Sequence, residues 1–133
     1  MNAKLNLKQI VIISIHALVI WMLCGATIGI GRSILKMDTV LIVHAIGAPL
    51  FAAVISSFYF IKFNYTKPLQ TAVIFLLVVM ILDASLVAPV FEHSYEMFRS
   101  IPGTWIPFAL IFLSTYITGK ILTYSRSDFG QKI

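Results

Sequence analysis

The sequence has few charged residues and almost no cysteine. Charged residues make up 11% of its 133 residues and Cys24 is its one cysteine, whereas an ordinary soluble domain is about 25% charged. A single cysteine cannot form a disulfide within the chain, which argues against membrane enzymes that act through cysteine pairs. A soluble protein of this size with so little charge could not hide its apolar surface from water, which argues against a soluble domain.

Apolar residues are abundant instead, and they gather in four long runs. They make up 59% of the chain, and each run can cross a hydrocarbon core of about 30 Å at about 1.5 Å per residue. The runs predict transmembrane helices at residues 10–30, 40–63, 69–91 and 102–122. Because the connections are short, consecutive helices are expected to be antiparallel neighbours. The sequence therefore predicts an all-α fold, a polytopic membrane protein that forms one antiparallel four-helix transmembrane bundle.

Lysine and arginine are distributed unevenly between the two ends of this predicted bundle. The richer end has Lys4, Lys8, Lys62, Lys67, Lys120, Arg126 and Lys132, and the poorer end has Arg32, Lys36 and Arg99. Because the positive side of a membrane protein faces the cytoplasm, we expect a plasma (inner) membrane protein with both termini in the cytoplasm. The basic residues form no patch interleaved with aromatic residues, so we expect the lipid bilayer as a partner and no nucleic acid.

Among the ionisable residues in the predicted outer half of the bundle, four are candidates for a ligand site or an ion pair: Arg32, His44, Asp83 and Glu92. An ionisable group inside a membrane costs about 2.5–3.5 kcal/mol on insertion scales and usually faces other protein or water. Asp83 is the one acid deep inside a run. Side chains lean toward the start of their own helix, which brings Arg32 and Asp83 toward each other. We therefore predict an Arg32–Asp83 ion pair with His44 nearby, in a structural or a functional role.

Small residues recur at spacings of four in two of the runs. They let a neighbouring backbone approach closely, so the faces that carry them are expected to pack against other helices. His44 begins one of these stripes, so it is expected to face the bundle rather than lipid. The residues predicted for helix packing are Gly25, Gly29, Ala48, Ala52 and Ser56.

No set of residues indicates a metal, a cofactor or a catalytic centre. Glu92, His93 and Glu96 lie close together in the sequence, but they lack the full ligand set of a tetrahedral metal site. His16 and His44 are predicted at depths that differ by more than about 10 Å, which is too far apart for the two to share a haem.

Three functions remain open on the sequence alone. The first is a small transporter or small-molecule-binding bundle with a polar cavity in its outer half. The second is an accessory or structural subunit that packs against a larger membrane partner or another copy of itself. The third is a lipid-modifying membrane enzyme with His44 and Asp83 as acid and base, which ranks last because no nucleophile accompanies them.

Overall fold

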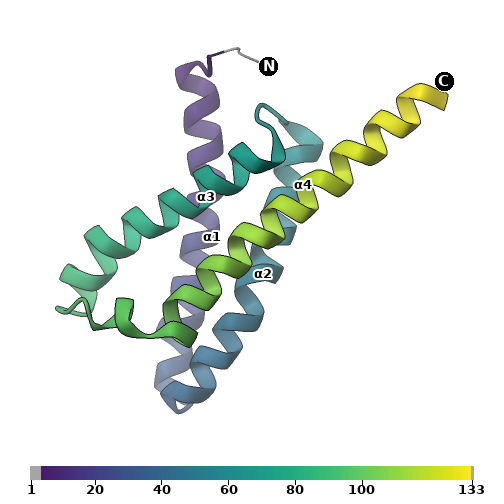
Figure 1. Cartoon of the computed structure of the whole chain (residues 1–133). Helices are drawn as coiled ribbons and strands as arrows, with labels where there is room; N and C mark the ends of the chain where they lie inside the picture. Colours follow the sequence, from purple (N-terminus) through teal and green to yellow (C-terminus); the bar gives the residue numbers. More distant parts are fainter. Residues whose placement is uncertain (1–3, 133) are drawn as a thin grey trace.

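The computed structural model describes residues 4–132, including the side chains of residues 4–101 and 103–126, and within this range all regular structure is helical (Figure 1). Four helices are long and apolar enough to span a membrane, which confirms that part of the sequence prediction. The elements are α1 (Leu7–Ile34), α2 (Met37–Lys62), α3 (Pro68–Leu82), the π-helix η1 (Asp83–Phe91), the 3₁₀-helix η2 (Glu96–Arg99), the π-helix η3 (Ile101–Trp105) and α4 (Ile106–Lys132).

Helix α1 begins three residues before its predicted apolar run, at Leu7, and polar residues cap its start. The Asn6 side chain accepts a hydrogen bond from the Gln9 backbone N–H at 2.9 Å, and the Gln9 side chain accepts one from the Asn6 N–H at 3.1 Å. This reciprocal arrangement satisfies N–H groups that have no partner inside a helix. At the start of α3, Pro68 takes the first helical position, where its missing N–H costs nothing.

The four long helices form a closed ring of contacts. Helix α2 packs against α1 and α4, and α3 packs against the same two helices from the other side (Figure 1). One hydrogen bond between α4 and α2 runs from the Ser114 hydroxyl to the Pro49 carbonyl at 2.7 Å. The ring therefore encloses a common interior to which all four helices contribute.

One end of this interior, which we call the closed end, is filled by aromatic side chains that surround a cluster of hydrogen-bonded hydroxyl groups. The Tyr59 and Thr66 hydroxyls are 2.8 Å apart, and the Thr66 and Thr71 hydroxyls are 2.6 Å apart. All three residues are buried, with Phe60 and Phe75 beside them. Buried polar groups that satisfy one another in this way tie the α2–α3 connection to the bundle.

Gly119 of α4 allows a close helix contact at the same end. A Cβ atom there would lie 2.6 Å from Phe60 Cζ and 2.8 Å from Pro68 Cβ. These distances are shorter than carbon atoms tolerate, so only glycine fits between α2 and α3 without displacing them.

The two glycines predicted to pack helices behave differently. Among the described residues, nothing from a neighbouring element lies within 4 Å of a Cβ built at Gly25 or Gly29. The predicted close packing at these positions is therefore wrong, and both glycines line a cavity instead. Ala48, Ala52 and Ser56 of α2 are fully buried in the ring.

Only the first part of the third predicted run is α-helical. Helix α3 ends at Leu82 and the chain continues as the π-helix η1. In this helix the Glu92 N–H donates to the Val87 carbonyl, five residues earlier, at 2.8 Å. Pro89 lies inside it and has no N–H to donate. Wide turns of this kind are frequent at functional sites, and η1 forms one wall of the cavity.

The outward faces of the helices are apolar. On α2, Ile42, Ile46, Leu50 and Val54 are each 61–67% exposed and follow one another at intervals of four residues. In the most apolar stretch of each long helix, at most 28% of the residues are buried. The ring thus presents large aliphatic side chains on its outside.

Candidate functional site: a cavity lined by all four helices

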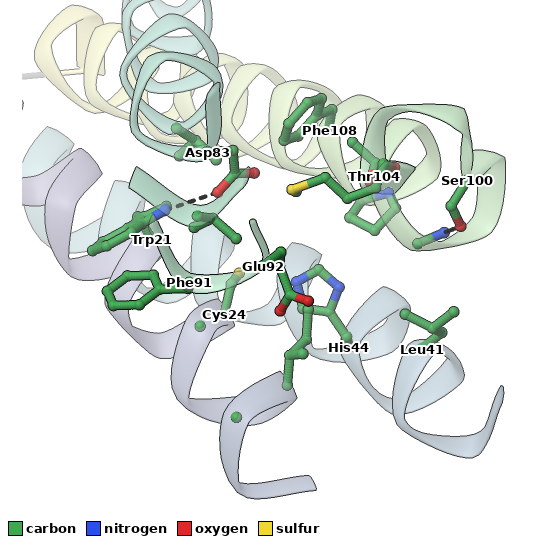
Figure 2. A pocket seen from close by; sticks show the side chains of 18 of the residues that line it. Trp21, Cys24, Leu41, His44, Asp83, Phe91, Glu92, Ser100, Thr104 and Phe108 are labelled. Carbon is green, nitrogen blue, oxygen red and sulfur yellow. Dashed lines mark hydrogen bonds between the residues drawn. The ribbon is translucent and has the colours of Figure 1, made fainter. Parts of the chain in front are cut away.

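The end of the ring opposite the closed end is hollow. A cavity of about 780 Å³ lies between α1, α2, η1 and the residues around η3 and the start of α4 (Figure 2). We call this the cavity end, formed by residues 32–41 and 92–105. All four candidate residues of this half of the bundle, Arg32, His44, Asp83 and Glu92, line the cavity.

Asp83 occupies the point where α3 passes into η1. Its Oδ1 accepts a hydrogen bond from the indole Nε1 of Trp21 on α1 at 2.9 Å (Figure 2). Both side chains are half-buried. An indole N–H inside a membrane-type bundle needs an acceptor, so the presence of Trp21 in the first run was a signal that sequence reasoning missed.

The predicted Arg32–Asp83 ion pair is wrong. Arg32 Nη2 contacts Glu92 Oε1 instead. Arg32 lies eleven residues beyond Trp21, which is about 16 Å along a helix axis, so a carboxylate level with Trp21 is out of its reach. The direction in which side chains lean along a helix could not reveal this pairing, because it does not determine how far one helix is shifted along its axis relative to its neighbour.

The Arg32–Glu92 pair joins the last turn of α1 to the residue that follows η1. The two side chains remain 43% and 34% exposed. Ion pairs this exposed contribute about 0–1 kcal/mol to the free energy of folding. The pair therefore does more to fix the rim of the cavity than to stabilise the fold. Beside it, Glu96 forms a second pair with Arg99 at 3.5 Å.

His44 of α2 forms part of the opposite wall. The residue is only 6% exposed, and its ring is presented to the cavity (Figure 2). Its Nδ1 is buried and has no hydrogen-bond partner among the residues that the structure describes. A buried polar group left without a partner costs about 1–3 kcal/mol, so the site contains an unmet hydrogen-bonding requirement.

The connection between η1 and α4 is fixed by its own hydrogen bonds. The Thr104 hydroxyl donates to the Met97 carbonyl, and the Trp105 indole donates to the Phe98 carbonyl at 2.7 Å. The Ser100 hydroxyl accepts from the Gly103 N–H at 3.1 Å. These bonds hold Met97, Ser100 and Thr104 as a formed wall of the cavity.

The remaining polar residues of the runs lie away from this site. His16 of α1 sits in an aromatic cluster with Phe58, Tyr59 and Phe63, and its Nδ1 is 2.7 Å from the Ile12 carbonyl oxygen. Within residues 4–126, no group of three or more His, Cys, Asp or Glu residues could hold a metal ion. The cavity therefore combines apolar walls with a few hydrogen-bonding groups.

Comparison of the chain with protein-family models, with curated proteins and with solved structures gave no match in any of the three.

Proposed function

We propose that this chain is a polytopic protein of the plasma (inner) membrane whose four antiparallel helices hold a small molecule in the cavity. One observation carries the proposal: all four helices contribute to a single cavity that contains Arg32, His44, Asp83 and Glu92. A volume of about 780 Å³ falls within the range of about 300–1,000 Å³ that is typical of ligand sites.

The outward faces support insertion in a bilayer. Exposed aliphatic rows such as Ile42, Ile46, Leu50 and Val54 would be costly in water and are solvated by lipid. The excess of Lys and Arg at the closed end supports a cytoplasmic location for that end and for both termini. On this orientation the cavity end faces the outside, and the ligand enters from there.

Two alternative functions have less to support them. An accessory subunit would pack against a partner, whereas Gly25 and Gly29, two of the small residues predicted to pack helices, line the cavity. A lipid-modifying enzyme would need His44 and Asp83 to act on one group together with a nucleophile. Asp83 is held by Trp21, an orientation suited to binding.

Cysteine accessibility tests this proposal. In a Cys24→Ser background, Gly29→Cys places a thiol in the cavity wall, and Ile30→Cys, one residue further on, places one on an outward face that is 63% exposed. We expect a membrane-impermeant cationic methanethiosulfonate, added to intact cells, to modify the cysteine at 29 and not the one at 30. Modification at 30 alone, or at neither while Ser94→Cys reacts, would contradict an outward-facing cavity.

A further inference from the structure

The charges in the cavity are not balanced. Glu92 is paired with Arg32, and Glu96 is paired with Arg99. Asp83 has no Lys, Arg or His partner within 4 Å among the described residues, and its one hydrogen bond comes from the neutral indole of Trp21. The cavity therefore holds one carboxylate whose charge no basic side chain compensates, and a ligand is free to supply the missing positive charge.

The surroundings of Asp83 suit a cation that is also apolar. The Trp21 ring lies beside the carboxylate, and Phe91 and Phe108 belong to the same cavity (Figure 2). Aromatic rings attract cations, most strongly where water is excluded. Aliphatic side chains such as Leu41 and Val87 complete the walls, so the rest of the ligand is in contact with hydrocarbon.

The carboxylate also selects the kind of cation. Trp21 donates to one oxygen of Asp83, Oδ1. An ammonium group that carries N–H can donate a hydrogen bond to the carboxylate, whereas a quaternary ammonium has no N–H to donate. Asp83 therefore favours a primary or secondary ammonium group.

Resting on the proposed function, we infer that the ligand is an organic monocation: a primary or secondary ammonium group on a compact apolar body. The ammonium group lies against the Asp83 carboxylate and next to Trp21. The apolar body lies against Phe91, Phe108 and Leu41. An anion would meet the Asp83 carboxylate and find Arg32 already engaged with Glu92.

Four probes that share one aromatic body test this inference. They are a primary amine (1-naphthylmethylamine), its trimethylammonium analogue, a neutral alcohol (1-naphthalenemethanol) and a carboxylate (1-naphthaleneacetate). Binding is followed by Trp21 fluorescence in protein that carries Trp105→Phe and is reconstituted in lipid nanodiscs, with empty nanodiscs as the control for partition into lipid. We expect the primary amine to bind about tenfold or more tightly than the alcohol, since a hydrogen bond between charged groups is worth about 1.5–3 kcal/mol. We expect the acetate to bind weakest.

Variants then assign the preference to residues. Asp83→Asn should remove the preference for the amine over the alcohol, while the alcohol still binds and so reports that the cavity is intact. The same variant should reduce the preference for the amine over its trimethyl analogue, because the analogue has no N–H to donate to the carboxylate. Asp38→Asn is the matched control, because Asp38 is an exposed acid of the same end that does not line this cavity, and it should change neither.

The outcomes separate this inference from the function on which it rests. If the alcohol or the acetate binds as tightly as the amine, the cation inference is overturned and a binding cavity remains. If no probe binds saturably above empty nanodiscs, the binding function itself fails. Should Asp83→Asn not fold, the ranking of the four probes on the parent protein still decides the question.

Discussion

A side chain added at Gly25 would enter empty space, whereas one added at Gly119 would meet Phe60 and Pro68. The two glycines look alike in the sequence, since both lie inside long apolar runs. In the folded protein they differ in which side chains lie opposite them. Opposite responses to substitution are therefore expected at the scale of the single residue.

Gly25→Leu should leave the stability of the protein unchanged or slightly raised. Leucine favours a helix over glycine by up to about 1 kcal/mol, and no neighbouring element must move. The same side chain occupies part of the cavity, so binding of 1-naphthylmethylamine should weaken. Thermal unfolding in detergent and probe titration measure the two effects; a lower melting temperature would mean that this face packs against protein.

Gly119→Ala should destabilise the ring by about 1–3 kcal/mol, which is the usual cost of forcing an extra carbon into a packed contact. The methyl group must displace either the Phe60 ring or Pro68. A lower melting temperature is the expected result, while probe binding at the other end should persist in the folded fraction. The control is Gly25→Ala, the same change made at an open position.

The Trp21–Asp83 hydrogen bond should appear as a coupling free energy. A double-mutant cycle with Trp21→Phe and Asp83→Asn should give about 1.5–3 kcal/mol, the range for hydrogen bonds to charged groups. The same cycle on Arg32→Gln with Asp83→Asn should give a value near zero, because the arginine contacts Glu92. Equal coupling in both cycles would restore the Arg32–Asp83 pair.

At the scale of the element, η1 determines where Glu92 points. In a π-helix the backbone hydrogen bonds join residues i and i+5 rather than i and i+4, so each such turn accommodates one extra residue. Pro89→Ala supplies the N–H that the proline inside η1 lacks, which should let the full-length segment wind as α-helix and rotate the following residues by about 100°. The Arg32–Glu92 contact would then be lost while the helix content stays the same.

A crosslinking experiment measures this rotation. Arg32→Cys with Glu92→Cys, in a Cys24→Ser background, should be joined by a short bifunctional maleimide when Pro89 is present and not in the Pro89→Ala variant. Circular dichroism controls for loss of helix. Crosslinking of equal yield in both proteins would show that η1 does not set the position of Glu92.

The elements themselves were predictable from the sequence, and the site was predictable only in its composition. Run length and hydropathy locate four helices, but they do not distinguish α- from π-helical winding, so Asp83–Phe91 was expected as ordinary helix. Arg32, His44, Asp83 and Glu92, which line the cavity, could be singled out from the sequence because ionisable groups in apolar runs are rare. Their pairing could not, because it depends on how far α1 is shifted along η1.

At the scale of the whole molecule, topology is the decisive measurement. Reporter fusions at the N-terminus, at Lys67 and at the C-terminus should give cytoplasmic signals, and fusions near Lys36 and Glu96 should give external ones, as the distribution of Lys and Arg requires. Arg32→Glu combined with Arg99→Glu serves as a control that should leave the orientation unchanged. A cytoplasmic signal at Glu96 would contradict four antiparallel spans.

The cavity draws its lining from all four helices, and this has a consequence for biosynthesis. While the ribosome is still making α4, Trp21 and His44 can be in the bilayer, but the pocket they will share does not yet exist. If the cavity holds a ligand as proposed, only a finished chain can bind it, and a ligand at about 100 times its dissociation constant stabilises the folded state by about 2.7 kcal/mol. Nascent chains and truncated products are not stabilised in this way, so the ligand would selectively stabilise chains that have completed folding.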